Sequence, residues 1–217
     1  MRAILIISII NLLFSIRVPS ATAQAKWRFE LMTGDAFCFK TPLTIKQSGY
    51  EDISLKAKYE TNSFKLPIYY SVRIAKWKNQ RAWELEFVHL KIKLKDNPPE
   101  IERFEISHGF NLYYVNRCWN YKTFILRLGA GIVFAHPENT VRGKSLDQSK
   151  GILNMGYYIA GPTFQLTLCR KFGLWQNLRF LIEGKVTASY ARVPVFHGHA
   201  NVTNVAIHGL AGLGYEF

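Results

Sequence analysis

The 217-residue sequence contains only three cysteines, Cys38, Cys118 and Cys169, and they are far apart. This number is too small for the disulfide framework of a small secreted domain, and the spacing fits no zinc-binding motif. The sequence leaves open one bridge, between Cys118 and Cys169, because an oxidising periplasm permits disulfides. Since three is an odd number, at least one cysteine is unpaired within the chain.

The sequence also lacks any long apolar run after residue 23, so it contains no candidate for a transmembrane helix of about twenty residues. The uncharged stretch 3–16 follows a basic residue and is itself followed by the small residues Ala21-Thr22-Ala23. This order is typical of a secretory signal peptide, which we predict over residues 1–23. The mature chain, 24–217, is then a single exported domain, and any part of it that crosses a membrane must do so as β-strands.

Acidic residues are scarce. The chain has 15 of them against 28 Lys and Arg, giving a formal charge of +13, and removal of residues 1–23 takes away two arginines and leaves +11. Such a charge favours a polyanionic partner. For an exported protein we expect phosphorylated lipid headgroups and exclude nucleic acid.

Alternation of apolar and polar residues with a period of two predicts β-strands. The segments that show it are 27–34, 63–77, 82–94, 102–117, 121–135, 157–171, 177–190 and 202–217. Short connections alternate strictly with long ones, as in a membrane barrel with tight periplasmic turns and long extracellular loops. The sequence therefore predicts an all-β fold, an eight-stranded antiparallel up-and-down transmembrane β-barrel. The segment 53–59 also alternates, and we expect it to extend the second strand above the bilayer.

The two faces of the predicted strands also fit a membrane barrel. In 121–135, Arg127 lies on the face opposite Phe124 and Leu128, and in 177–190 Glu183 and Lys185 lie opposite apolar residues. Polar residues would face the lumen and apolar residues the lipid, the reverse of a soluble barrel. The last strand ends on an aromatic residue and puts on one face Val205, Ile207, Ala211, Leu213, Tyr215 and Phe217.

These features predict a monomer in the outer membrane of a Gram-negative bacterium. Its partners would be outer-membrane lipids and the barrel assembly machinery. A barrel of eight strands has a lumen filled largely by side chains, so we do not expect a wide pore.

One strand breaks its alternation. In 82–94, Glu84 has the opposite parity to His89 and Lys91, so a regular strand cannot direct all three into the lumen. A β-bulge near Phe87 and Val88 would do so, and bulges often re-aim side chains beside functional sites. Alternatively, the lysines simply emerge above the membrane.

The sequence lacks a Gly-x-Ser-x-Gly elbow, a Walker loop and a dinucleotide fingerprint. Ser107 and His108 are adjacent in a predicted strand and would face opposite sides, which disfavours a Ser–His hydrolase. His108 has the parity of Phe104 and Phe110, which we expect to face lipid. It therefore lies in the interface or the predicted register is wrong.

None of the six histidines is predicted at the periplasmic rim, and His208 is predicted to face inward. Ionisable groups in a narrow lumen must pair or bind something, so we expect a lumen site near the outer leaflet. For Glu183 and Lys185 a salt-bridge network that merely fills the interior is the alternative.

Several runs resemble, in their order along most of the mature chain, the small outer-membrane barrel family that includes bacterial lipid A oxidase. They are Leu55-Lys56-Ala57-Lys58, Leu66-Pro67-Ile68-Tyr69-Tyr70, Phe87-Val88-His89-Leu90-Lys91, Phe104-Glu105-Ile106-Ser107-His108-Gly109-Phe110-Asn111-Leu112, Gly129-Ala130-Gly131-Ile132, His136-Pro137-Glu138, Gly161-Pro162 and Glu183-Gly184-Lys185-Val186-Thr187. The resemblance implies an eight-stranded barrel. It also implies oxygen-dependent conversion of the proximal glucosamine of lipid A to aminogluconate, with a divalent metal.

With this resemblance, candidate roles are assigned as follows. The residues expected to be catalytic are His89, His108, His136 and Glu183. Those expected to bind the substrate, lipid A of lipopolysaccharide, are Lys91, Asn111 and Lys185. Those expected to hold a divalent metal are His89, His136 and Glu183. Imidazole and carboxylate ligands suit iron or manganese.

Two other functions compete with the oxidase. A non-catalytic barrel for envelope integrity or surface adhesion would need only a satisfied lumen and exposed loops. A lipid A acyl-chain hydrolase would need the nucleophile geometry that the sequence does not indicate.

Overall fold

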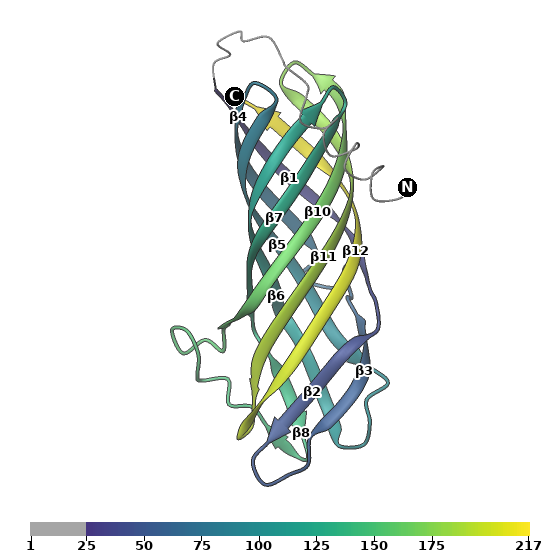
Figure 1. Ribbon diagram of the computed structural model, residues 1–217, viewed down its shortest axis with the longest axis vertical. Coiled ribbons are helices and arrows are strands. Elements are labelled where there is room, and N and C mark those ends of the chain that lie inside the picture. Colours follow the sequence, from purple (N-terminus) through teal and green to yellow (C-terminus); the bar gives the residue numbers. More distant parts are fainter. Residues whose placement is uncertain (1–24) are drawn as a thin grey trace, which may run out of the picture.

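The computed structural model describes residues 25–217, so the predicted signal peptide lies outside the described residues. No helix in this range is long and apolar enough to cross a membrane. The described chain folds into twelve strands (Figure 1): β1 (Lys26–Cys38), β2 (Thr41–Gln47), β3 (Ile53–Glu60), β4 (Tyr70–Lys78), β5 (Arg81–Lys95), β6 (Ile101–Tyr121), β7 (Phe124–Ala135), β8 (Glu138–Val141), β9 (Lys144–Ser145), β10 (Tyr158–Trp175), β11 (Leu178–Val195) and β12 (Gly198–Glu216).

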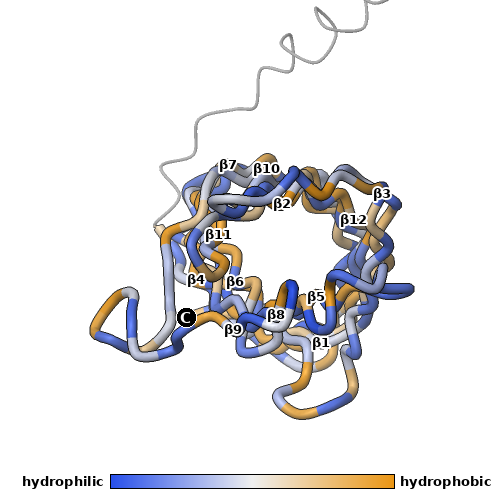
Figure 2. Tube along the Cα trace, turned by 90° about the horizontal axis from the view of Figure 1, so that it is seen from below, coloured by the Kyte–Doolittle hydropathy of each residue, from blue (hydrophilic) through white to orange (hydrophobic). Residues whose placement is uncertain are grey.

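Eight of these strands close into a ring. Following the hydrogen-bonded neighbours, the order is β1, β4, β5, β6, β7, β10, β11 and β12, and β12 pairs back with β1. Every pairing in the ring is antiparallel, and Figure 2 shows the closed wall end on. The prediction of an eight-stranded antiparallel up-and-down barrel is confirmed.

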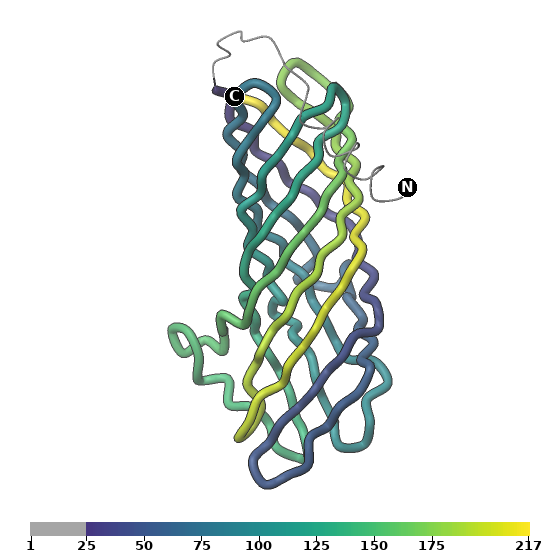
Figure 3. Tube along the Cα trace, in the orientation of Figure 1, coloured from purple at the N-terminus to yellow at the C-terminus, as the bar shows by residue number. Residues whose placement is uncertain are grey.

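Two hairpins lengthen the barrel wall at the end remote from the C-terminus (Figure 3). β2 pairs with the first residues of β12, and β3 returns along β2 and pairs with the last residues of β5. β8 and β9 likewise extend from β6. The expectation that 53–59 extends the second strand is confirmed in outline, because β3 pairs with β5 at Lys93 and Lys95 and β4 continues along the same strand from His89. The 61–69 segment interrupts the two strands. Strands that project beyond the ring expose backbone groups, and the hairpins supply their hydrogen-bond partners.

The polarity of the barrel interior changes along the length of the barrel, as β11 illustrates. The inward-facing residues of β11 are polar from Glu183 to Ser189 and apolar beyond it, in the order Glu183, Lys185, Thr187, Ser189, Ala191, Val193 and Val195. The outward-facing residues change in the opposite sense, in the order Phe180, Ile182, Val186, Tyr190 and Arg192. The half of the barrel near the C-terminus therefore has a polar interior and an apolar exterior, whereas the other half, here called the outer half, is built like a soluble barrel.

Aromatic side chains mark both edges of the apolar exterior. At the C-terminal rim the exposed ones include Trp27, Trp83, Trp175, Tyr215 and Phe217. At the other edge a row of rings crosses five neighbouring strands or their ends, with centroids 4.9–6.1 Å apart: Tyr70, Phe87, Tyr113, Phe134 and Tyr157. An apolar band between two aromatic girdles is the surface of an outer-membrane barrel. We call the second row the outer girdle.

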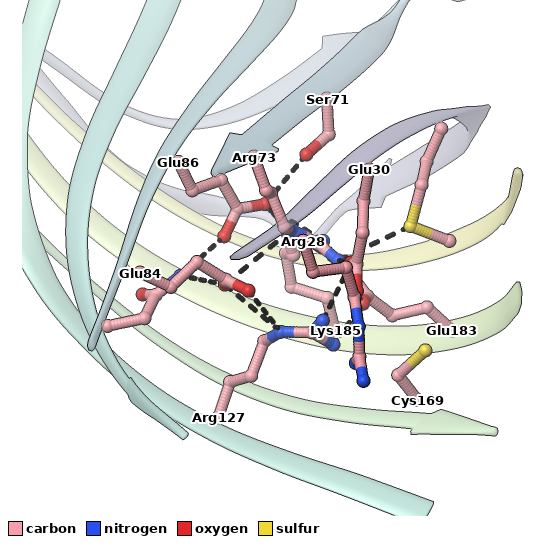
Figure 4. A network of polar contacts seen from close by, with 12 residues as sticks. Arg28, Glu30, Ser71, Arg73, Glu84, Glu86, Arg127, Cys169, Glu183 and Lys185 are labelled. Carbon is pink, nitrogen blue, oxygen red and sulfur yellow. Dashed lines mark hydrogen bonds and ion pairs between the residues drawn. The ribbon is translucent and has the colours of Figure 1, made fainter. Parts of the chain in front are cut away.

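An ion network fills the lumen inside the apolar band (Figure 4). It combines four cationic and four anionic side chains: Arg28, Arg73, Arg127, Lys185, Glu30, Glu84, Glu86 and Glu183. Arg73 contacts Glu86 at 2.9 Å and also bonds Glu183, and Arg127 lies 3.0 Å from Glu84. The numbers of opposite charges are equal, so each buried ion has oppositely charged neighbours that offset part of the cost of removing it from water.

The three cysteines are free and buried. Cys118 lies in β6 and Cys169 in β10, both near the C-terminal rim, and each is buried on the inward face of its strand. The bridge that the sequence left open between them is therefore absent from the structure.

Replacement of Arg73 tests the ion network. The variant Arg73→Ala leaves the carboxylates of Glu86 and Glu183 buried without a main partner, and we expect it to lower the free energy of unfolding by about 3–5 kcal/mol. Urea unfolding in lipid vesicles measures this loss. The matched control is Lys46→Ala, which breaks an exposed pair with Asp52 and is expected to cost less than about 1 kcal/mol. Equal losses in the two variants would contradict the role assigned to the network.

Candidate functional site

A wide bulge in β6 is the main irregularity of the barrel wall. Leu90 pairs with Phe110 and Ile92 pairs with Ile106, so three residues of β6 stand opposite Lys91 alone. These three are Ser107, His108 and Gly109. The bulge predicted near Phe87 and Val88 is absent, because both residues pair in regular register with β4 and β6. The irregularity lies beyond Leu90, and its extra residues belong to β6.

Gly109 makes the bulge feasible. Its φ is +137°, a conformation that residues with a Cβ rarely adopt, and an added Cβ would lie 2.3 Å from the Asn111 amide. The backbone oxygen of Gly109 accepts a hydrogen bond of 3.1 Å from the His136 N–H, which ties the bulge to the end of β7. The bulge directs His108 outward, with 63% of its side chain exposed. Phe104 and Phe110, expected to face lipid, instead point inward and are buried.

Three side chains converge beside the bulge. Glu138 Oε1 bonds Nδ1 of His108 and lies 3.8 Å from Nδ1 of His136. One ligand atom from each of the three residues lies within 4.8 Å of those of the other two. His108 comes from β6, His136 follows β7, and Glu138 opens β8, so the cluster forms where the wall of the outer half branches from the ring.

The protonation of this cluster suits a metal. Partial burial and the neighbouring His108 ring lower the pKa of His136, which keeps its imidazole neutral. Partial burial acts to raise the pKa of Glu138, but hydrogen bonds from Ser107 and His108 and the charge of Arg103 lower it overall. Nδ1 of His136 is buried and has no hydrogen-bond partner among the described residues. A neutral imidazole and a carboxylate are the forms that bind cations.

His89 and Asn111 lie on the same outer face, next to the outer girdle. Nδ1 of His89 lies 2.8 Å from Oδ1 of Asn111, and the His89 ring stacks on Tyr70 with centroids 5.4 Å apart. Phe134 pairs with Asn111 and stacks on Tyr157, which in turn contacts His136 at 4.8 Å between centroids. His89 and His136 therefore lie against rings of the outer girdle, at the level expected for lipid headgroups.

A cavity of about 270 Å³ opens beside His108. Its basic lining comes from Lys65, Lys91 and Lys93, and Ser107 and His108 form part of its wall. Lys91 is buried and donates a hydrogen bond of 2.6 Å to the Lys65 carbonyl. The full lining is Glu60, Thr61, Asn62, Lys65, Leu66, Pro67, Lys91, Ile92, Lys93, Glu105, Ser107 and His108. Glu60 and Glu105 also line the cavity, and Lys93 Nζ lies 3.9 Å from Glu105 Oε2. The three ammonium groups exceed the two carboxylates, so the lining keeps a positive charge that favours an anionic occupant.

The structure does not bring all the predicted site residues together. His108 and His136 converge with Glu138, and His89 and Asn111 lie near them on the outer face. Glu183 and Lys185 lie instead in the ion network, each bonded to oppositely charged partners. The expected metal set of His89, His136 and Glu183 is therefore divided between the outside and the lumen of the barrel.

The expectation of a lumen site is also wrong for the histidines. His89 has the outward parity of Leu85 and Phe87, since Glu84 and Glu86 take the inward positions. Of the six histidines only His208 is buried within the lumen, where Tyr69 and Thr187 satisfy both ring nitrogens at 2.9 Å. His208 therefore has a structural environment, and the histidine cluster lies on the exterior.

Glu138 is absent from the residues expected to bind metal, although a signal for it exists in the sequence. In His136-Pro137-Glu138 the two polar residues are two positions apart, the spacing that places side chains on one face of an extended chain. Ser107 was expected to face away from His108, but the bulge brings both to Glu138, and Ser107 Oγ donates to Glu138 Oε1 at 2.8 Å.

No protein-family model matches the sequence, and neither does any curated protein. Among solved structures, the chain is similar to the attachment invasion locus protein Ail of Yersinia pestis, with a TM-score of 0.41 and 11% identity over 91% of this chain and 100% of that one. It is also similar to Neisserial surface protein A, with a TM-score of 0.40 and 9% identity over 91% and 100% of the two chains. For the outer membrane protease OmpT of Escherichia coli the TM-score is 0.40, with 9% identity over 93% and 99%. The similarity concerns the barrel fold alone.

The exterior cluster predicts metal binding. We expect the protein in lipid vesicles to bind one Mn²⁺, and His136→Ala and Glu138→Gln each to weaken binding by at least about tenfold, because loss even of a residue that only supports a metal ligand costs this much. Electron paramagnetic resonance of free Mn²⁺ measures the affinity. The control variant, His199→Ala, removes an exposed histidine that contacts Arg192 outside the cluster and should bind as wild type does. Unchanged binding in His136→Ala would exclude the site.

Proposed function

We propose that the protein modifies lipid A in the outer membrane of a Gram-negative bacterium, at the exterior cluster of His108, His136 and Glu138. The observation that carries this proposal is the place of the cluster. It lies on the outside of the barrel, directly beyond the outer girdle, where the sugar headgroup of a lipid in the outer leaflet would be. A lumen closed by the ion network leaves the exterior as the surface at which a lipid can react.

The basic cavity supports an anionic lipid as substrate. Lipid A carries phosphate groups on a glucosamine disaccharide, and ammonium groups bind phosphate as point charges. Lys65, Lys91 and Lys93 line a cavity that His108 also lines. A phosphate bound by these lysines would hold the sugar beside the histidine cluster. Asn111, expected to bind substrate, lies in the same region through its contact with His89.

The reaction that we propose is oxidation of the proximal glucosamine to aminogluconate. The substrate would be a lipid A whose proximal glucosamine has a free anomeric hydroxyl and keeps its phosphate on the other sugar. The anomeric carbon loses two electrons and two protons to give a lactone, dioxygen accepts both and becomes hydrogen peroxide, and water opens the lactone to the acid. Two histidines and one carboxylate are the ligand set of non-haem iron oxygenases, and a bound iron or manganese ion would supply the redox capacity. Glu138 Oε1 bonds Nδ1 of His108 and so fixes the orientation of that ring.

A hydrolase that removes an acyl chain is a second candidate, favoured by one observation. Ser107, His108 and Glu138, a nucleophile, a base and a carboxylate, share one hydrogen-bonded cluster. Nucleophilic catalysis requires the base to contact the serine. Among the described residues Ser107 instead donates to Glu138, so the oxidase is the better supported reaction.

Mass spectrometry of lipid A tests the proposal. Cells whose lipid A has a free anomeric hydroxyl and that produce the wild-type protein in the presence of oxygen should yield lipid A with the mass of one added oxygen atom, and Glu138→Gln should abolish the change. His199→Ala, outside the cluster, should leave it intact. Heat-modifiable migration in gels verifies that each variant is folded.

Each other result has a distinct meaning. Loss of an acyl chain that depends on Ser107 would replace the oxidase with the hydrolase. An unchanged spectrum from correctly folded wild-type protein would contradict both reactions and favour a non-catalytic barrel for envelope integrity or adhesion.

A further inference from the structure

The outer half of the barrel has an unusual distribution of exposed apolar side chains. Its strands present mainly polar residues to the outside, among them Lys46, Lys56 and Arg192. Two connections differ, the 61–69 segment between β3 and β4 and the 146–157 loop between β9 and β10. Leu66 and Leu153, at their tips, are 89% and 84% exposed, the highest values among the large apolar residues that the structure describes. The other exposed apolar side chains of the two connections are Phe64, Ile68, Ile152 and Met155.

The two connections lie on either side of the histidine cluster. Leu66 and Pro67 of the 61–69 segment line the basic cavity together with His108. In the 146–157 loop, the hydroxyl of Tyr157 donates to the His108 carbonyl at 3.2 Å. A Cβ added to Gly156 of this loop would lie 2.7 Å from Nε2 of His136, so the loop passes directly against the cluster.

Internal bonds hold both connections in shape. In the 146–157 loop, Gly156 N–H donates to the Lys150 carbonyl at 2.7 Å, and Gln148 donates to the Pro137 carbonyl at 3.0 Å. In the 61–69 segment, Tyr69 N–H donates to the Ser63 carbonyl at 2.7 Å. The green 146–157 loop projects sideways from the barrel wall (Figures 1 and 3). The apolar tips therefore have defined positions, directed away from the protein core.

The surface next to the 146–157 loop indicates what covers its tip. Tyr157, at the end of the loop, stacks on Phe134 with centroids 5.1 Å apart and ring planes within 8°. Phe134 belongs to the outer girdle and pairs with Ile159, which is exposed on the lipid side of β10. The apolar loop is thus continuous with the lipid-facing surface, and apolar side chains next to a bilayer lower their free energy by entering it.

We propose that the tips of the 61–69 segment and the 146–157 loop enter the outer leaflet and contact lipid acyl chains on both sides of the histidine cluster. The two tips form a clamp that opens sideways to the bilayer. A lipid would reach His108 by lateral diffusion, with its acyl chains beside Leu66 and Leu153 and its headgroup at the cavity. The clamp depends on the membrane position of the barrel and is independent of the reaction catalysed.

Spin labelling in vesicles of phosphatidylethanolamine and phosphatidylglycerol tests the clamp. Leu66→Cys and Leu153→Cys place a nitroxide at each tip, and both positions are exposed, so the barrel should fold normally. Molecular oxygen concentrates in hydrocarbon, whereas a nickel chelate remains in water. We expect both labels to collide more with oxygen than with nickel. The wild-type protein, whose three cysteines are buried, gives the labelling background.

Two matched positions calibrate the measurement. Leu213→Cys lies on the lipid face of β12, and Lys46→Cys lies on the exposed face of β2 in the outer half. Labels at Leu66 and Leu153 that behave like the label at Leu213 support the clamp. If either behaves like the label at Lys46, the clamp is overturned. Low collision rates with both reagents would mean that a second protein chain covers the tips, which also overturns it. None of these outcomes depends on lipid A modification.

Discussion

The buried ion network is the constraint on which the rest of the barrel depends. Lipid accepts the apolar faces of eight strands, so their other faces are polar and meet in a lumen too narrow for water to solvate every charge. Four cations and four carboxylates neutralise one another there, with Arg73 and Arg127 each contacting several glutamates. A lumen filled in this way carries no substrate. The recognition and chemistry that we propose are therefore assigned to the outer surface.

The outer half of the barrel has the opposite arrangement of polar and apolar faces. Its exterior meets water, so its interior holds apolar side chains, and the two extra hairpins complete its wall. This core also supports the candidate site. Ile106 and Phe110, on either side of the bulge, are fully buried in it, so the strand is anchored at both ends of the distorted stretch. A bulge pinned in this way positions the intervening His108 far more narrowly than a free loop would.

The strands, the ring and the alternation of faces follow from the sequence because each depends on a period of two, which hydrophobicity displays directly. The bulge does not. It adds two residues to β6, so Phe104, Ile106 and Phe110 keep one parity, and the pattern shows no break where the geometry changes. His108 shares that parity yet points the opposite way. The cluster of His108, His136 and Glu138 could not be predicted for a similar reason. Glu138 reaches His108 because β8 branches from the wall at β6, and residue types alone do not specify that branch.

An exterior site has an energetic advantage for a lipid substrate. Each methylene moved from hydrocarbon to water costs about 0.8 kcal/mol, so withdrawing one chain of about twelve carbons would cost roughly 9 kcal/mol. An enzyme whose site lay in the lumen would have to offset that cost for every chain. Where His136 and Glu138 follow the outer girdle, the headgroup meets polar side chains while the chains remain in the leaflet. The position of the cluster therefore makes a sealed barrel compatible with the proposed chemistry on a membrane lipid.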